Sequence, residues 1–352
     1  MLRVLNVMLG SGLGGIEQAS LDHAQALIQQ GVEVLSVLSP TAAIAPAFRA
    51  LDLPIVSLRN LGAWDWLARR RLHALWRKAG SSLAIAHGNR ALSLLAGGPG
   101  QVVNVIHNYR LQHLSLADAV IAVTPALARR AEALGFAPSR VLALSNMLAS
   151  IPPLEARGAN EPPVIGALGR FVAKKGFASF LQALALLRER GVSFQAVLGG
   201  AGAEEAALRA LAASLGLARH LRWCGWVDDK PAFYRRLDVM CLPSLEEPFG
   251  IVLLEAFAHG VAVVTSDAEG PLQIVDGRDT AVVYPKESPA ALAAALEALL
   301  ANPDQRERLS RAAYADVCAR YAMPVVGARL ASWLSSVAAG VERSTETKPS
   351  AT

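Results

Sequence analysis

The sequence predicts an α/β fold built from two doubly wound, Rossmann-like domains. Three observations predict it: short aliphatic runs alternate with longer amphipathic runs, glycine-bearing turns follow several aliphatic runs, and a segment rich in proline, glycine and charge divides the alternation in two. The chain has 352 residues and is 53% hydrophobic, so it can bury two sizeable cores. Because open parallel sheets bind ligands at the carboxyl ends of their strands, two such sheets in tandem also predict a central cleft that both domains face.

Residues 1–150 form the predicted N-terminal domain. Its buried parallel strands are expected at the aliphatic runs 3–9, 32–38, 83–87, 102–107, 119–124 and 141–146. Between the first two, residues 16–31 have apolar positions at helical spacing, as a crossover helix would. The segment IPPLEARGANEPP, residues 151–163, interrupts the alternation and is the predicted linker.

Residues 164–320 repeat the alternation and form the predicted C-terminal domain. Its strands are expected at 164–170, 194–200, 221–227, 239–244, 261–266 and 281–285. A C-terminal helix over residues 321–338 is expected to pack back on the N-terminal domain, and residues 339–352 are expected to form a flexible tail.

Charge and cysteine content narrow the function classes. Residues 1–150 hold 13 Lys+Arg against 7 Asp+Glu and carry the positive charge of the chain, which suits an anionic membrane or an anionic substrate. Aromatic and basic residues are not interleaved as on a nucleic-acid surface, so no nucleic-acid partner is expected. The three cysteines have no metal-ligand spacing, and neither a signal sequence nor a bilayer-spanning stretch is evident, which together predict a cytoplasmic protein.

The first glycine-bearing turn, Gly10 to Gly15, matches the dinucleotide fingerprint GxGxxG. A nicotinamide site also needs an acid at the end of the second strand, where this chain has Ser39 and Pro40. We therefore expect the loop to let a phosphate or a sugar approach a helix N-terminus, with a tight turn that binds no ligand as an equal alternative.

The second turn, GRFVAKKG at residues 169–176, directly follows the first strand of the second domain. Its Arg170 and Lys175, with the amides of a helix that opens near Gly176, would bind a diphosphate. The alternative is a pair of solvated bases at the start of a helix.

The third turn, EEPFG, leads into an apolar helix expected to begin near Ile251. Glu247 precedes this helix, Glu255 lies just over one turn inside it, and the amides of Gly250 and Ile251 are free donors. Carboxylates accept hydrogen bonds from vicinal hydroxyls, so the pair can hold a ribose and a sugar of one ligand. Stabilisation of the helix dipole by Glu246 and Glu247 is the alternative, and it leaves Glu255 unexplained among apolar neighbours.

The segment SLEEPFGIVLLEAFAHGVAVVTSD, residues 244–267, is similar to the signature of glycosyltransferase family 4, the retaining GT-B enzymes, in which seven residues separate two glutamates. Residues 169–177 resemble the phosphate-binding segment of that family, residues 197–227 its base-binding region, and residues 10–27 its N-terminal glycine loop. The resemblance extends to about Leu334. It implies a GT-B fold in which the second domain binds a nucleotide-sugar donor and the first binds the acceptor, with neither a cofactor nor a divalent metal.

The resemblance also implies roles for individual residues. Arg170 and Lys175 would neutralise the leaving diphosphate. Glu247 would bind the transferred sugar and Glu255 the ribose. His107 would lie close to the transferred sugar, with a core-edge histidine as an equal alternative. The remaining donor-binding residues would be Gly14, Gly15, Trp226, Val227, Gly250 and Ile251.

The acceptor-side candidates are His87, Arg90 and Asn146. His87 and Arg90 lie where the family places an acceptor-side histidine, and packing at a strand end is the alternative. Asn146 stands alone where the family more usually has Pro-Asn-Gly. At Gln273 the chain has an amide where the family commonly has a carboxylate, so hydroxyl recognition there is expected to differ.

Residues 61–80 combine tryptophans with basic residues, as a helix at a membrane interface would. These residues are Trp64, Trp66, Trp76, Arg69, Arg70, Arg71, Arg77 and Lys78. The alternative is a crossover helix with an inner stripe of Leu67, Leu72 and Leu75 and a solvated basic face. If the helix contacts an anionic membrane, the acceptor is a lipid-linked glycan or a lipopolysaccharide core at the inner leaflet.

The residues and the resemblance together predict a metal-independent retaining glycosyltransferase, a hexosyltransferase. It would move a sugar from a nucleoside-diphosphate sugar to a glycan or glycolipid acceptor in bacterial cell-envelope polysaccharide or lipopolysaccharide core synthesis. The expected location is the cytoplasm, peripheral to the inner face of the cytoplasmic membrane. A non-catalytic nucleotide-sugar-binding protein and a nicotinamide-dependent oxidoreductase are the alternatives.

Overall fold

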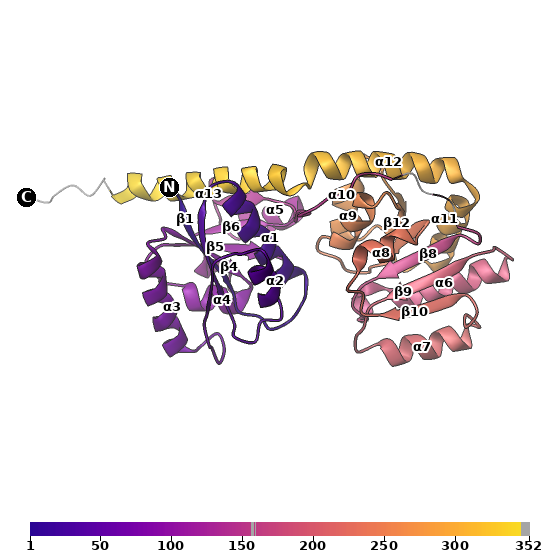
Figure 1. Cartoon of the computed structure of the whole chain (residues 1–352), viewed down its shortest axis with the longest axis horizontal. Helices are drawn as coiled ribbons and strands as arrows, with labels where there is room; N and C mark the ends of the chain where they lie inside the picture. Colours follow the sequence, from indigo (N-terminus) through magenta and orange to yellow (C-terminus); the bar gives the residue numbers. More distant parts are fainter. Residues whose placement is uncertain (156–157, 159, 346–352) are drawn as a thin grey trace, which may run out of the picture. The chain divides into compact units, whose positions relative to one another are not determined.

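The computed structural model describes residues 1–155, 158 and 160–345, and it divides into two compact units. Unit 1 contains Met1–Ala149 and the chain from Ala322 onward, and unit 2 contains Ser150–Tyr321. Each unit is built on one parallel sheet with helices on both faces (Figure 1). The predicted α/β class with two doubly wound domains is therefore confirmed.

Unit 1 has a seven-stranded parallel sheet in the order β3-β2-β1-β4-β5-β6-β7. Its strands are β1 Arg3–Met8, β2 Glu33–Leu38, β3 Ile55–Ser57, β4 Leu83–His87, β5 Gln101–Ile106, β6 Ala119–Ala122 and β7 Val141–Ala143. Each aliphatic run predicted as a strand in this unit overlaps one. Strand β3 was not predicted from the sequence, because three half-exposed residues at a sheet edge are too few to show a period.

The helices of unit 1 include one from the far end of the chain. They are α1 Gly15–Gln29, α2 Ala45–Ala50, α3 Trp66–Ala79, α4 Asn89–Leu95, α5 Pro125–Ala133 and α13 Met323–Thr345, with short 3-10 helices η1 Leu114–Leu116 and η2 Pro138–Arg140. Helix α13 packs against α1, where Gly327 lies over Ala26. The amide of Met323 donates to the carbonyl of Leu148 at 3.0 Å, so α13 begins next to the end of the segment Met1–Ala149 of unit 1.

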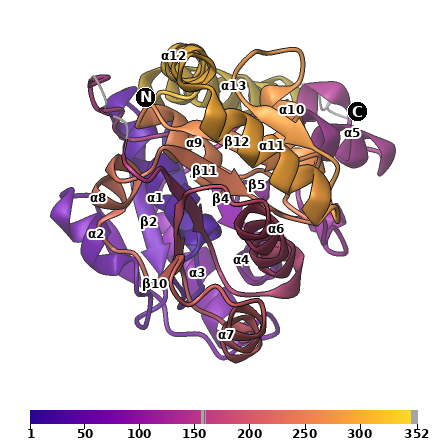
Figure 2. The same ribbon diagram turned by 90° about the vertical axis from the view of Figure 1, so that its right-hand side faces the viewer.

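Unit 2 has a six-stranded parallel sheet in the order β10-β9-β8-β11-β12-β13. Its strands are β8 Val164–Leu168, β9 Gln195–Gly199, β10 Leu221–Gly225, β11 Val239–Leu242, β12 Ala262–Ser266 and β13 Val282–Tyr284. Its helices are η3 Ala173–Lys175, α6 Phe177–Glu189, α7 Glu205–Ser214, α8 Lys230–Arg235, α9 Ile251–Ala258, α10 Glu269–Val275, α11 Pro289–Ala301 and α12 Pro303–Arg320. Helix α6 packs against both α7 and α11, and all three cover one large core (Figure 2).

The strand order reverses once in each sheet, between β1 and β4 and between β8 and β11. At such a point the loops after the two neighbouring strands diverge to opposite faces of the sheet, which opens a crevice at their carboxyl ends. The glycine loop follows β1 and the phosphate-binding turn follows β8. The glycine loop and the phosphate-binding turn therefore each lie at the reversal point of their own sheet.

Helix α3 differs from both sequence interpretations. Trp76, expected at a membrane interface, is fully buried and its indole donates to the carbonyl of Ser81 at 2.9 Å. Leu67, expected in the inner stripe, is 48% exposed. The inner stripe is instead Ala68, Leu72 and Trp76, because a four-residue spacing keeps these side chains on one helix face. Within the part of the chain that the structure describes, no helix is long and apolar enough to cross a membrane.

Candidate functional site

The phosphate-binding turn connects β8 to α6. Arg170 is exposed, and Lys175 ends the short helix η3. Gly176 then opens α6 with φ of +68°, a conformation that glycine adopts without strain. A Cβ at Gly176 would also lie 1.9 Å from the carbonyl oxygen of Pro243. The turn therefore needs glycine at this position to pack against the loop after β11.

Glu247 lies in that loop after β11 and is nearly buried. Its Oε2 accepts hydrogen bonds from the ammonium of Lys175 and, at 3.4 Å, from the hydroxyl of Ser244. The carbonyl of Lys174 accepts the amides of Leu245 and Glu246 at 2.8 and 3.1 Å, so the two turns are also joined through the backbone. The ion pair thus joins residues 72 positions apart.

Gly270, at the start of α10, packs against the loop after β11 that carries Glu247. Its amide donates to the carbonyl of Glu247 at 3.0 Å, and a Cβ at Gly270 would lie 2.5 Å from backbone atoms of Glu247 and Phe249. Gln273, the amide that replaces the carboxylate of the resembling family, is half-buried on the same short helix. The glycine of this element therefore positions Glu247 directly.

Glu255 lies in the second turn of α9, and both of its carboxylate oxygens are bound. Lys230 donates to Oε1 at 2.6 Å and the hydroxyl of Tyr234 donates to Oε2 at 2.8 Å. Burial and the neighbouring carboxylate raise the pKa of Tyr234 well above its ordinary value, so its hydroxyl remains a donor. Lys230 and Tyr234 were not predicted as site residues, because their four-residue spacing on α8 places them on one face but does not indicate which residues they contact.

The other donor-side candidates of unit 2 follow β10 and β11. Gly250 caps α9 with φ of +101°, and the helix begins at Ile251 as predicted. After β10, Trp226 is 50% exposed, whereas Val227 packs where a Cβ of Gly199 would stand. Of the two proposed base-binding residues, only Trp226 presents a large apolar surface to solvent.

In unit 1, the glycine loop after β1 already holds a carboxylate. Gly14 caps α1 and its amide donates to Glu17 at 3.1 Å, while a Cβ at Gly10 would lie 2.6 Å from the same carboxylate. The negative charge of Glu17 repels a pyrophosphate, whereas its carboxylate can accept a hydrogen bond from a hydroxyl group. Arg90 lies beside the loop, where its guanidinium donates to the carbonyl of Leu9 at 3.2 Å.

The histidine candidates lie at the carboxyl ends of β4 and β5. His87 is buried, and Asn6 and His107 hydrogen-bond its ring, which favours the alternative of packing at a strand end. His107 is only partly buried by its neighbours, and desolvation lowers its pKa to about 3. Asn146 is half-buried in the loop after β7, and its Oδ1 has no hydrogen-bond partner among the described residues.

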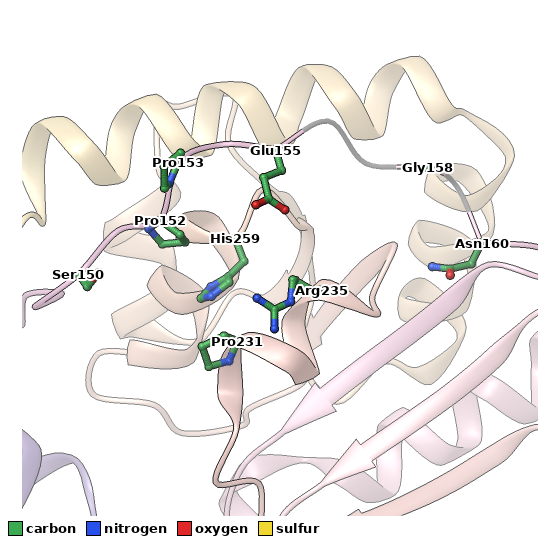
Figure 3. Close-up of a pocket in the computed structure, with 9 residues that line it drawn as sticks. All are labelled: Ser150, Pro152, Pro153, Glu155, Gly158, Asn160, Pro231, Arg235 and His259. Carbon is green, nitrogen blue, oxygen red and sulfur yellow. The ribbon is translucent and has the colours of Figure 1, made fainter.

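A hollow of about 390 Å³ lies in unit 2, and none of the predicted site residues lines it (Figure 3). It is lined by Ser150, Pro152, Pro153, Glu155, Gly158, Asn160, Pro231, Arg235 and His259. Figure 3 shows Glu155 and Arg235 directed toward the same space. His259 stacks on Tyr234, so this hollow adjoins the far side of the Glu255 cluster. In the described chain, no group of three or more acidic, histidine or cysteine side chains could hold a metal ion.

The sequence is similar to those of known glycosyltransferases. Residues 155–316 match the family model described as "Glycosyl transferases group 1". Over 306 residues the chain is 28% identical to the lipopolysaccharide core biosynthesis glycosyltransferase LpsE of Rhizobium meliloti (strain 1021). This match covers 84% of this chain and 88% of LpsE. Over 175 residues it is 39% identical to the phosphatidyl-myo-inositol mannosyltransferase of Mycobacterium leprae (strain TN), covering 49% of this chain and 46% of that one.

Among solved structures, Anabaena Alr3699/HepE in complex with UDP and glucose is similar with a TM-score of 0.81 and 18% sequence identity. The match covers 96% of this chain and 100% of that one. The structural likeness identifies the fold as GT-B. The sequence matches relate the chain to the glycosyltransferases.

Proposed function

We propose that this protein is a retaining, metal-independent glycosyltransferase of family 4 that uses a nucleoside-diphosphate sugar. The observation that carries the proposal is the arrangement after β8 and β11, where Glu247 is paired with Lys175 and the same turn after β8 carries the exposed Arg170. Carboxylates accept sugar hydroxyls, and neighbouring cations bind phosphate. A sugar diphosphate needs both groups side by side.

The cations would act on the leaving group. An ammonium has three N–H donors, so Lys175 can bind a phosphate oxygen and keep its contact with Glu247. The guanidinium of Arg170 offers a planar fork that matches phosphate oxygens. Together they would stabilise the charge that develops on the diphosphate as the sugar leaves, a role that divalent ions fill elsewhere.

The relatives guide the choice of donor and acceptor. HepE is named in complex with UDP and glucose, which supports a nucleoside-diphosphate sugar as the donor here. LpsE is named for lipopolysaccharide core biosynthesis, and the mycobacterial relative for a phosphatidyl-inositol acceptor. We infer that this protein glycosylates a glycan or glycolipid of the bacterial cell envelope and works in the cytoplasm, at the inner face of the membrane.

The test is a panel of UDP-, GDP- and ADP-sugars, each incubated with the protein in EDTA. We expect slow hydrolysis of one donor, with the released sugar first seen by NMR in the anomeric configuration it had in the donor. Release of the inverted anomer would contradict retention, and activity only after a divalent ion is added would contradict metal independence. Tight nucleotide binding without hydrolysis or transfer would instead favour a non-catalytic binding protein.

A second surface supports a membrane-associated acceptor. We define the α3 face as Leu61, Trp64, Trp66, Leu67, Arg70, Arg71 and Arg77, all of them exposed. Asp65 caps α3 through Ala68 and also accepts the amide of Leu61, so the loop that carries Trp64 is fixed to the helix. Apolar side chains next to guanidinium groups fit a bilayer with anionic headgroups.

We expect Arg70, Arg71 and Arg77→Gln together to weaken binding to phosphatidylglycerol-containing vesicles about a hundredfold, since each basic residue contributes about 1 kcal/mol. Arg69 is left unchanged because it donates to the carbonyl of Ala96 and supports the fold. The control is Arg209, Arg308 and Arg311→Gln, which removes the same charge from exposed positions of unit 2. Equal cosedimentation of both triple variants would show that α3 does not bind the membrane.

A further inference from the structure

A row of buried polar side chains crosses the sheet of unit 1 from β2 to the end of β5. Ser36, Asn6 and His87 lie on the neighbouring strands β2, β1 and β4, and His107 directly follows β5. The strand registers place Ser36 beside Asn6 and His87 beside Met8, two residues beyond Asn6, so these side chains share one face. Polar side chains buried in an apolar sheet are normally hydrogen-bonded, so the partners of each one have to be identified.

The hydrogen bonds of Asn6 fix its orientation. Its Nδ2 donates to the backbone carbonyl of Ser20 at 2.9 Å and to the hydroxyl of Ser36 at 3.3 Å. Because a carbonyl can only accept, the amino group of Asn6 must face Ser20. Its Oδ1 therefore faces His87, at 2.8 Å from Nε2.

This orientation determines where the proton of His87 lies. The Oδ1 of Asn6 can only accept, so Nε2 of His87 must carry hydrogen. Complete burial lowers the pKa of His87 well below its ordinary value, so the ring is neutral and its Nδ1 is a lone pair. That lone pair lies 3.4 Å from Nε2 of His107, which must then be the donor.

The tautomer of His107, at the end of the row, follows from the same hydrogen bonds. With its own pKa lowered to about 3 by burial, His107 is also neutral and carries its one ring proton on Nε2. Its Nδ1 is left as an acceptor, and it has no hydrogen-bond partner among the described residues. The third histidine, His23, has its ring 5.3 Å from that of His87 but takes no part in the row of hydrogen bonds.

We propose that Asn6 and His87 are positioning residues that hold His107 in the Nε2–H tautomer and so present its Nδ1 as a hydrogen-bond acceptor. The row of hydrogen bonds begins with the donor His107 at the carboxyl edge of the sheet and ends at a backbone carbonyl of α1, that of Ser20, which accepts from Asn6. The ligand of Nδ1 is a hydroxyl group of the sugar substrate, and this last step rests on the proposed function.

The tautomers are measured directly by two-bond ¹H–¹⁵N NMR spectra of the folded protein labelled with ¹⁵N-histidine. We expect His87 and His107 each to show a protonated, pyrrole-like Nε2 and an unprotonated, pyridine-like Nδ1. His87→Gln and His107→Gln identify the two sets of signals. A pyrrole-like Nδ1 at His107 in the unaltered protein overturns the proposal without any variant.

The variant Asn6→Leu removes the acceptor for His87 while keeping a similar side-chain size. We expect the nitrogen shifts of His107 to become intermediate between the two tautomers, and kcat to fall roughly tenfold or more with the donor KM unchanged, as when a partner that orients a histidine is lost. The matched control, Ser36→Ala, removes only the 3.3 Å contact and should keep both the tautomer and kcat.

The outcomes separate this inference from the proposed function. Unchanged His107 shifts in folded Asn6→Leu overturn the role of Asn6 and His87 as positioning residues. Shifted tautomers with an unchanged kcat overturn the sugar contact of His107 and leave the hydrogen-bond row in place. Signals of a histidine of the same unit that lies outside the row, such as His73, whose Nε2 is 3.1 Å from the carbonyl of Leu94, report whether unit 1 of the variant is folded. The spectrum of the unaltered protein decides the tautomer in any case.

Discussion

Arg170→Ala and Lys175→Ala should each lower the rate of sugar transfer about a hundredfold or more, because removing one charged group that stabilises a leaving anion costs about 3 kcal/mol. Both side chains follow β8, and Lys175 also meets the buried Glu247. The measurement is kcat with the donor found in the panel of nucleotide sugars. Loss of binding to the free nucleoside diphosphate, titrated by calorimetry, should accompany the loss of rate.

The neighbouring lysine provides the control for this prediction. The side chain of Lys174 is 41% exposed, and its ammonium lies 3.4 Å from the carboxylate of Glu246, whose side chain is 55% exposed, so the pair has little energetic consequence. Lys174→Ala keeps the backbone carbonyl that joins the two turns and should keep near-full activity. If Lys174→Ala and Lys175→Ala lose activity equally, the turn supplies only general positive charge. If Arg170→Ala stays fully active, the guanidinium of Arg170 has no part in stabilising the leaving group.

Glu255 and Glu247 should affect different kinetic constants. Losing a charged acceptor to a hydroxyl costs about 1.5 to 3 kcal/mol, so Glu255→Ala should raise the donor KM roughly tenfold or more through lost ribose contacts. Glu247→Ala should instead lower kcat, because its partner Lys175 ties it to the leaving-group end of the site. The measurement is donor kinetics together with titration of the nucleoside diphosphate.

Isosteric variants separate charge from shape in this prediction. Glu255→Gln keeps one acceptor for Lys230 or Tyr234 and should raise KM less than the alanine variant does. Glu246→Ala, at an exposed position next to Glu247, is the matched control and should change neither constant. A reversed result, in which Glu247→Ala loses nucleotide and Glu255→Ala keeps it, would exchange the two roles, and unchanged kinetics in both would reduce the pair to helix stabilisation.

Much of the fold could be predicted because the relevant signals are local. Runs such as VIGAL and VMCL are apolar on both faces, which marks buried parallel strands, and each proved to be one. The start of α9 at Ile251 followed from a glycine before an apolar helical run. The edge strand β3 escaped prediction because three half-exposed residues carry no period, and Leu67 was misplaced because either side of α3 offers leucines.

The residues of the candidate site could be predicted from the sequence better than the contacts between them. Glycine-bearing turns after strands indicated where Arg170, Lys175 and Glu247 would gather, since parallel strands end at a common edge. The partners of Glu255 escaped prediction, because Lys230 and Tyr234 belong to a different crossover helix. Asn6 did give a signal, a lone amide within an apolar strand, but nothing in the sequence says which strand lies beside it.

By itself the sequence determined the kinds of element, their order and the turns that carry charge, because hydrophobic period and turn chemistry act over a few neighbouring residues. Only the tertiary structure decided which side chains meet. Lys175 pairs with Glu247 across 72 positions, and Asn6 with His87 across 81. Crossover connections bring strands together in an order and register set by packing of the whole sheet, so the ion pair and the histidine tautomers exist only once that sheet has formed.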